Sequence, residues 1–231
     1  MQNSILKYYQ SQQVKAPHRG LKWSEFPTTG SWRISTRDYL YDHNLSLQEI
    51  SKLETVYPSL DGICFVLIGG ERLQDYAYQE RLIPPPMLAD GKAPLRWRNP
   101  IDTSLHNYVF VPWIWEEIPT LNSQCIYLVE GCTDAVRLYT EGYISVGLLG
   151  VALTEGRKRI VHQIQERVSE INSTDTIPLW FVADNDGPGE RLVGKITREF
   201  GCRVLRLSHH AKDVCDLTDE ELQCILKTPI S

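Results

Sequence analysis

The sequence predicts an α/β protein, in which a parallel sheet flanked by helices is preceded by a smaller mixed α+β subdomain. Two observations carry this prediction: strand-like and helix-like segments alternate in the second half, and those strand-like segments are apolar throughout. Continuous apolar strands joined by helices are typical of parallel sheets that are covered on both faces. The predicted parts are an extended basic arm at residues 1–30, a first subdomain at residues 31–120, the α/β domain at residues 121–217 and a C-terminal helical tail at residues 218–231.

In the first half, residues 1–30 show no sustained periodicity and contain several prolines, which predicts an extended arm. Residues 36–54 are predicted to be helical, with Ser46 and Glu49 spaced as a capping box. Short apolar or alternating runs then predict strands within the segments 63–69, 75–82 and 107–115. These elements favour a small mixed sheet with helices at its start.

In the second half, four strands are predicted at CIYLVE, YISVGLLG, PLWFVAD and CRVLRLS. Three helices are predicted between them, at TDAVRLYTEG, EGRKRIVHQIQERVSEI and GPGERLVGKITREFG. Gly142 and Gly201 are expected to end the first and third of these helices. Ligands of such sheets bind at the carboxyl ends of the strands, so the residues that follow each strand are the candidate site.

Composition and cysteine usage limit the class of protein. The chain has 231 residues, of which 42% are hydrophobic, enough for one large or two small domains. No apolar run approaches the length of a membrane span, which needs about 18 to 20 residues. The first residues also lack the apolar segment expected of a signal peptide. Six cysteines occur without any CxxC spacing, which disfavours a zinc site or disulfide framework. We therefore expect a cytoplasmic protein without a membrane partner.

The distribution of charge is uneven. The formal net charge of −5 at first sight disfavours a nucleic-acid partner. Residues 1–37, however, contain six lysines and arginines and only one acidic residue. Two interpretations of this basic arm stay open, a solvated disordered terminus and a segment that contacts nucleic acid.

Acidic residues gather after three of the predicted strands. They form three pairs along the chain: Glu130 and Asp134, Asp184 and Asp186, and Asp213 and Asp216. Because the strand ends meet at one edge of a parallel sheet, we expect one site rather than three. Such hard oxygen ligands suit Mg²⁺ or Mn²⁺ better than zinc, and two such ions can serve phosphoryl transfer.

Each pair also has a simpler interpretation. An aspartate just after a strand is often only the N-cap of the next helix, which would account for Asp134 or Asp186 alone. Asp213 and Asp216 alone could be solvated loop residues. Three clusters at the same edge favour the metal site. Gly187 and Gly189, which follow the second pair, are expected to let the backbone approach a ligand closely.

Four phrases between residues 124 and 217 resemble a Toprim domain, namely LVEGCTDA, GLLGVALTEG, VADNDGPGE and AKDVCDL. Toprim is the metal-binding unit of bacterial-type DNA primases, type IA and II topoisomerases and some nucleases. The VEGxxDA, LG-x-A-L-T and KDxxD wording is most similar to primases, particularly those of phages and mobile elements. RDYLYDHNLSLQEISKL, DYAYQERL and LRWRNP resemble, in the same order, the segment that precedes Toprim in primases.

The resemblance implies a primase-type RNA polymerase core, a nucleotidyltransferase of DNA replication. It would make short RNA primers from NTPs on a single-stranded DNA template with two Mg²⁺ or Mn²⁺ ions. The implied catalytic residues are Glu130, Asp184 and Asp186. The predicted nucleic-acid-binding or nucleotide-binding residues are Arg81, Arg96, Arg98, Asn99 and Lys212. For Arg96 and Arg98, a surface loop over Trp97 stays an alternative.

The sequence also departs from the primase pattern. It shows no zinc ribbon, helicase-docking module or phosphate loop, so we expect a replicative helicase or a separate template-recognition subunit as partner. DNDGPGE has proline where primases usually have alanine, a feature closer to nucleases and topoisomerases. The last acidic pair is spaced D-x-x-D, where the family has D-x-D. A Toprim nuclease, or a non-catalytic nucleic-acid-binding partner subunit, is therefore the alternative function.

Overall fold

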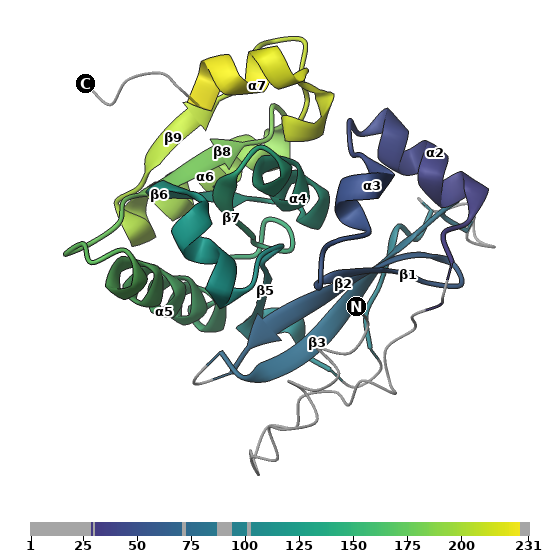
Figure 1. The fold of residues 1–231 in the computed structure, drawn as a ribbon. Helices are drawn as coiled ribbons and strands as arrows, with labels where there is room; N and C mark the ends of the chain where they lie inside the picture. Colours follow the sequence, from purple (N-terminus) through teal and green to yellow (C-terminus); the bar gives the residue numbers. More distant parts are fainter. Residues whose placement is uncertain (1–28, 30, 71–72, 87–93, 101–102, 227–231) are drawn as a thin grey trace.

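The computed structural model of the 231-residue chain describes residues 29, 31–70, 73–86, 94–100 and 103–226 (Figure 1). The predicted basic arm, except Thr29, lies outside the described residues, as does the end of the predicted C-terminal tail.

A single mixed sheet of nine strands runs through the described part of the chain, in the order β4-β3-β2-β5-β7-β6-β8-β9, with β1 beside β2 (Figure 1). Strands β7, β6, β8 and β9 are parallel, whereas the pairs on the other side are antiparallel. The strands are β1 (Val56–Pro58), β2 (Gly62–Gly69), β3 (Asp75–Leu82), β4 (Trp97–Arg98), β5 (Tyr108–Phe110), β6 (Asn122–Val129), β7 (Tyr143–Gly147), β8 (Leu179–Ala183) and β9 (Arg203–Arg206).

Six α-helices connect or flank the strands in the described residues. They are α2 (Ile34–Asp42), α3 (Leu47–Ile50), α4 (Cys132–Thr140), α5 (Glu155–Ile171), α6 (Gly187–Phe200) and α7 (Asp219–Leu226). The three helices predicted in the second half are confirmed. Gly201 ends α6 in the left-handed conformation, with φ of 60°, which glycine adopts without steric cost. Short 3₁₀ segments η2 (Leu105–Asn107), η3 (Trp115–Thr120) and η4 (Val214–Asp216) complete the chain.

The helical structure predicted over residues 36–54 is confirmed in two parts, α2 and α3, with a turn between them, and it ends at Ile50 and not at residue 54. Asn44 lies in this turn with a positive φ of 52°, a conformation that asparagine tolerates better than most residues. Ser46 precedes α3 but makes no side-chain capping hydrogen bond, so the predicted capping box does not form. The apolar pattern continues across the turn because both short helices bury residues in the same apolar layer, Leu40 from α2 and Ile50 from α3.

The two predicted halves share one sheet. Strand β5 of the first half pairs antiparallel with β7 of the second half, through Phe110 and Gly147. The sheet therefore crosses the predicted boundary near residue 120 without interruption. The division into two units stays a prediction, but the hydrogen-bonded sheet holds the basic residues of the first half in a defined position relative to the strand ends of the second.

Both faces of β7 and β8 and of the apolar part of β6 are buried, as the apolar runs predicted, whereas β9 at the edge of the sheet is only partly buried. On β6, Tyr127 and Val129 belong to an apolar layer that α2, α3, α4 and α7 cover, whereas Ile126 and Leu128 face the layer of α5 and α6 (Figure 1). This alternation follows from the two-residue period of a strand. The helices on both faces leave the carboxyl ends of β6 and β8 as the accessible edge.

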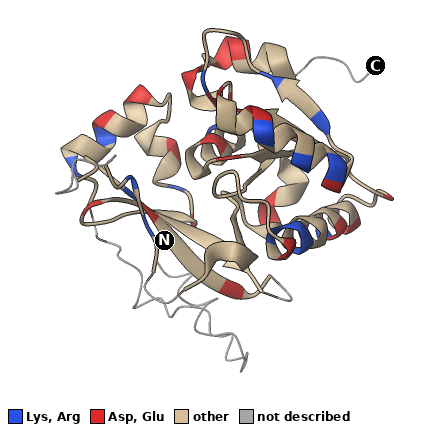
Figure 2. Ribbon diagram, turned by 180° about the vertical axis from the view of Figure 1, so that it is seen from behind, with Lys and Arg blue, Asp and Glu red and all other residues tan. Residues whose placement is uncertain are grey.

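Residues of both charge signs are distributed over the described part of the chain (Figure 2). Helix α7 carries three acidic residues in its first turn, and α5 carries both signs along its length. No helix in the described residues is long and apolar enough to cross a membrane. A cytoplasmic location stays a prediction.

Candidate active site

The three acidic pairs come together at one edge of the sheet. Glu130 directly follows β6 and Asp184 directly follows β8, and these two strands are parallel neighbours. The loop after β9 is held against the β8 end, because the backbone N–H of Asn185 donates to the carbonyl oxygen of Lys212 at 2.7 Å. This contact brings Asp213 to the same edge. The prediction that the carboxylates form one site is thus supported by the positions of the strands and loops that carry them.

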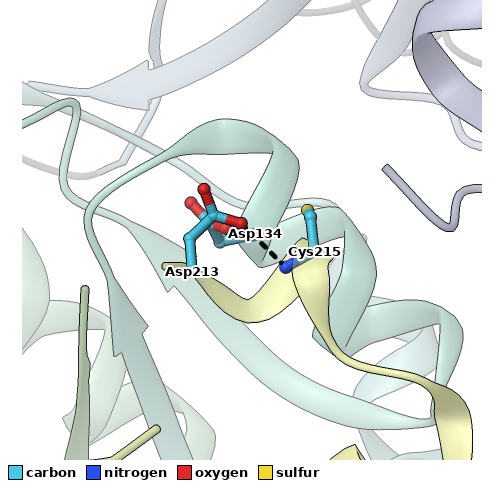
Figure 3. Close-up of side chains that lie close together, drawn as sticks. All are labelled: Asp134, Asp213 and Cys215. Carbon is cyan, nitrogen blue, oxygen red and sulfur yellow. Dashed lines mark hydrogen bonds between the residues drawn. The ribbon is translucent and has the colours of Figure 1, made fainter. Parts of the chain in front are cut away.

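Asp134, Asp213 and Cys215 form the most compact group in the site (Figure 3). Each offers one ligand atom, and these atoms all lie within 4.8 Å of one another. Asp134 comes from the first turn of α4, whereas Asp213 and Cys215 flank the start of η4. The backbone N–H of Cys215 donates to Asp213 Oδ1 at 3.1 Å, which orients the Asp213 carboxylate beside Asp134.

Crowding of these carboxylates in a buried place disfavours their charged forms. Burial and the charges of Asp134 and Glu130 raise the pKa of Asp184 to about 9. Burial and Asp213 raise the pKa of Asp134 to about 7. Burial and Asp186 raise the pKa of Glu130 to about 6. Mutual repulsion of this kind is relieved when a cation binds between the carboxylates.

Two buried oxygens in the site also lack hydrogen-bond partners among the described residues. These are Glu130 Oε1 and Asp134 Oδ1, whose side chains are 8% and 5% exposed. Buried polar atoms are nearly always satisfied by a protein group, water or ion. Together with the hard oxygen donors around them, they make this site suitable for divalent cations. The residues present therefore fit the metal ions that the primase resemblance implies.

Asp186 and Asp216 each make a structural hydrogen bond as well. Asp186 is the N-cap of α6, and its Oδ1 accepts from the N–H of Gly189 at 2.8 Å. Asp216 is exposed, and its Oδ2 accepts from the N–H of Lys212 at 2.7 Å. The helix cap that the sequence left open for Asp186 is thus present. The charge of Asp186 also contributes to the raised pKa of Glu130. A catalytic role for Asp186 and metal ligation by Asp216 stay predictions.

Gly189 permits the close packing of α6 against the site. A Cβ at this position would lie 2.3 Å from the Asp184 carbonyl oxygen and 2.9 Å from Glu130 Oε1. A Cβ at Gly187 would meet only the end of the Arg191 side chain, at 3.5 Å. The predicted close approach of Gly187 and Gly189 to a ligand stays a prediction; what the structure shows is that Gly189 lies close to Asp184 and Glu130 of the site itself.

Replacing Gly189 with alanine is expected to destabilise the protein by about 2 kcal/mol, because the methyl group would displace backbone that cannot yield easily. Gly194 in the same helix is the matched control, since a Cβ there meets nothing within 4 Å. Gly194→Ala should stabilise the protein by about 0.5 to 1 kcal/mol. Urea denaturation of both variants measures the difference; equal effects at the two positions would contradict the close approach.

The first half of the chain contributes side chains that the sequence did not indicate. Asn44 Nδ2 donates to the carbonyl oxygen of Cys215 at 2.8 Å, so the turn after α2 anchors the loop that carries Asp213. Burial raises the pKa of Tyr39 to about 12. The charge of Arg81 lowers this pKa and the charge of Asp134 raises it, so Tyr39 is close to both side chains. Nothing in the local pattern around Tyr39 or Asn44 pointed to the site. Cys215 could have been noticed from its place between Asp213 and Asp216.

Two of the predicted basic residues are connected with the acidic edge. Arg81 lies over the rings of Tyr39 and Trp97, with its guanidinium carbon 5.2 Å from each ring centroid. Lys212 Nζ lies 3.9 Å from Asp213 Oδ2, and its charge opposes the rise in the pKa of Glu130. Lys212 therefore offers positive charge next to the carboxylates, whereas Arg81 is linked to them only through Tyr39, whose pKa responds to the charges of both Arg81 and Asp134.

The other predicted contacts lie on the β3–β4 side of the sheet. Arg96 is exposed. Asn99 is exposed too, and its Oδ1 accepts a hydrogen bond from Gln79 Nε2 at 3.2 Å. Arg98 differs from both, because its guanidinium is paired with Glu80 Oε2 at 2.6 Å and with Asp61 Oδ2 at 2.7 Å. Since Glu80 is fully buried, this pairing gives Arg98 a structural role.

Replacing Arg98 with methionine is expected to cost about 2 to 3 kcal/mol of unfolding free energy, because Glu80 would be left buried without its partner. Arg96→Met is the matched control and should change stability by less than about 0.5 kcal/mol. Thermal or urea denaturation distinguishes the two residues. A destabilisation by Arg98→Met no larger than that of Arg96→Met would show that the pair with Glu80 contributes little.

Several solved structures have a fold similar to that of this chain. No family model and no curated protein sequence matches the chain. Among solved structures, the RNA polymerase domain of Mycobacterium tuberculosis primase DnaG is 13% identical, with a TM-score of 0.58 over 83% of this chain and 74% of that one. The E. coli primase catalytic core is 13% identical, with a TM-score of 0.52 over 84% of this chain and 72% of that one.

The chain has the fold of the primase catalytic core. A DnaG primase catalytic domain bound to single-stranded DNA is similar as well, at 14% identity and a TM-score of 0.52 over 84% of this chain and 73% of that one. The predicted primase-like Toprim fold is therefore confirmed, including the sheet of the first half. At this level of identity the similarity establishes the primase fold and not the activity.

Proposed function

We propose that this protein is a primase-like RNA polymerase core, which joins ribonucleotides on a single-stranded DNA template by metal-dependent nucleotidyl transfer. The observation that carries the proposal is the acidic edge of the primase fold, where buried carboxylates with unpartnered oxygens face one another. A similar structure was solved with single-stranded DNA, which supports such a template. A nucleotide-binding domain without catalysis would not need this concentration of charge.

The carboxylates have distinct parts in this proposal. Bound divalent cations would neutralise the triphosphate and lower the pKa of the attacking hydroxyl group. Asp184, Asp134 and Asp213 are the residues placed to hold such ions. Glu130, whose pKa burial raises to about 6, is suited to hold an ion or to accept a proton near neutral pH. Asp186 positions the N-terminus of α6 against Glu130 through its cap on Gly189.

The basic residues have the part of guiding phosphates. Lys212, beside Asp213, is placed to contact the phosphates of an incoming nucleotide. Arg81 is placed to contact the template or nucleotide backbone from the first half, with the exposed Arg96 and Asn99 farther along the sheet. Arg98 is left out of this set, since its guanidinium is engaged by two carboxylates.

The test is RNA synthesis by the purified protein. Single-stranded DNA, the four NTPs, one of them labelled, and Mn²⁺ or Mg²⁺ should yield short RNA that depends on both template and metal. An Asp184→Asn variant serves as the control for contaminating polymerases. The proposal is wrong if the wild-type protein makes no RNA with either metal and Asp184→Asn behaves identically in every nucleotide assay.

The same assay separates the alternative functions. Metal-dependent loss of a labelled DNA or RNA strand, without incorporation of NTPs, would identify a Toprim nuclease, which the GPGE phrase at the start of α6 favours. Binding of single-stranded DNA without either reaction would identify a non-catalytic partner subunit. A replicative helicase or template-recognition subunit is a proposed partner, and the wording of the motifs favours a phage or mobile element as the source.

A further inference from the structure

A cysteine lies among the carboxylates of the acidic site. Cys215 is 1% exposed and belongs to the group that it forms with Asp134 and Asp213. It comes two residues after Asp213, at the place where a D-x-D spacing would put the second acid. A thiol at this place gives the site one donor that is soft, whereas all its other donors are hard oxygens.

The geometry of the group suits a single ion. Metal–oxygen bonds of about 2.0 to 2.2 Å and metal–sulfur bonds of about 2.3 Å place the ligands of one ion up to about 4.5 Å apart. The three ligand atoms lie within 4.8 Å of one another, so small side-chain movements bring all of them into contact with one cation.

The Asp134 carboxylate gives independent evidence for a cation site, because one of its buried oxygens has no hydrogen-bond partner among the described residues. This oxygen is Oδ1, and the Asp134 side chain is 5% exposed. A buried carboxylate oxygen in this state costs free energy unless a cation or water satisfies it. The Asp213 carboxylate is held beside it by the N–H of Cys215.

We infer that Asp134, Asp213 and Cys215 bind a thiophilic divalent transition-metal ion, of the class of Zn²⁺, Co²⁺ and Cd²⁺, in preference to Mg²⁺. Soft thiolate ligands select such ions, which hard oxygen ligands alone do not. On binding, the S–H bond of Cys215 breaks, a sulfur–metal bond forms and the proton passes to solvent, without any change of oxidation state. The inference rests on the proposed function only in that both concern the same acidic site.

The test is a titration of the metal-free full chain with Cd²⁺ alone, followed by the thiolate-to-metal absorbance in the ultraviolet. We expect one equivalent of Cd²⁺ to saturate this absorbance, and excess Mg²⁺ not to remove it. Cys215→Ser should lose the absorbance and bind Cd²⁺ at least about tenfold more weakly, since even outer-shell changes lower metal affinity about 10- to 100-fold. Cys224→Ser, which alters an exposed cysteine, is the matched control and should retain both properties.

A second variant keeps the test decisive if Cys215→Ser does not fold. Asp134→Asn leaves the thiol intact but removes a carboxylate ligand, so it should also weaken Cd²⁺ binding by about tenfold or more. The inference is overturned if the wild type shows no such absorbance, or if neither variant weakens Cd²⁺ binding. Since the titration needs no RNA synthesis, absorbance without synthesis contradicts only the proposed function, and synthesis without absorbance contradicts only this inference.

Discussion

Asp184→Asn is expected to lower RNA synthesis by at least about 100-fold while the protein stays folded. Asp184 lies at the carboxyl end of β8, where burial and then the charges of Asp134, Glu130 and Asp213 raise its pKa to about 9. A carboxylate at this centre is the group best placed to hold a catalytic cation. Removal of one group that stabilises developing charge typically costs about 10²- to 10³-fold in rate. The measurement is incorporation of labelled NTPs at saturating Mn²⁺.

Asp216→Asn is the matched control for this prediction. Asp216 is exposed and lies outside the compact group, and its Oδ2 already accepts the N–H of Lys212. An asparagine oxygen can accept the same hydrogen bond, so we expect RNA synthesis close to that of the wild type. If Asp216→Asn lost as much activity as Asp184→Asn, the acidic loop after β9 would supply a second necessary carboxylate.

The stability of the metal-free protein is expected to fall as pH rises from about 4 to about 9. The pKa values of Asp184, Asp134 and Glu130 are raised to about 9, 7 and 6, whereas unfolded carboxyl groups titrate near pH 4. Between these limits the folded state binds more protons than the unfolded state, so the free energy of unfolding decreases with rising pH. A loss on the order of 3 kcal/mol would lower the Tm by roughly 6 to 12 °C.

Divalent cations should reverse most of this loss at about pH 8. An ion that binds only the folded state stabilises it by about 2.7 kcal/mol at 100 times its Kd. Melting curves in EDTA, and with Mn²⁺ or Mg²⁺, between about pH 5 and pH 9 measure both effects. In EDTA at the higher pH, Asp184→Asn should melt above the wild type, since it removes a carboxyl group that is ionised in the unfolded chain but must take up a proton or be buried as a charge on folding. A Tm that rises with pH in EDTA would show that the carboxylates are not mutually repelling in the folded protein.

The local sequence pattern correctly predicted the helices of the second half of the chain. Helix α5 was predicted at its observed bounds, because five apolar residues repeat along one face. The structure adds that the Thr154 side chain caps its start.

The local pattern did not locate the turn at residues 43–46 between α2 and α3, because Leu40 and Ile50 on either side of it are buried in the same apolar layer. The positive φ of Asn44 belongs to a local C-cap of α2, in which the N–H groups of Asn44 and Leu45 donate to the carbonyl oxygens of Tyr41 and Leu40. The hydrogen bond from Asn44 to Cys215 is the tertiary contact that the local pattern could not show.

The same distinction applies to the site. That Glu130 and Asp184 meet could be predicted, because they end strands of one parallel sheet. That Arg98 pairs with the buried Glu80 while Arg96 stays exposed could not, since β3–β4 pairing decides which arginine faces which carboxylate. Asp186 was open to two interpretations, and its hydrogen bond to Gly189 shows that the helix cap is at least one of its roles.

The sequence by itself determined the alternation of strands and helices in the second half, and the strand ends that carry carboxylates. These features depend on periodicity and turn chemistry, which are properties of neighbouring residues. Only the tertiary structure decided that Asn44 anchors the acidic loop 171 residues away, and that the thiol of Cys215 lies with Asp134 and Asp213. Such contacts depend on how loops pack across the sheet edge, and the burial that follows from this packing sets the charge state of the site.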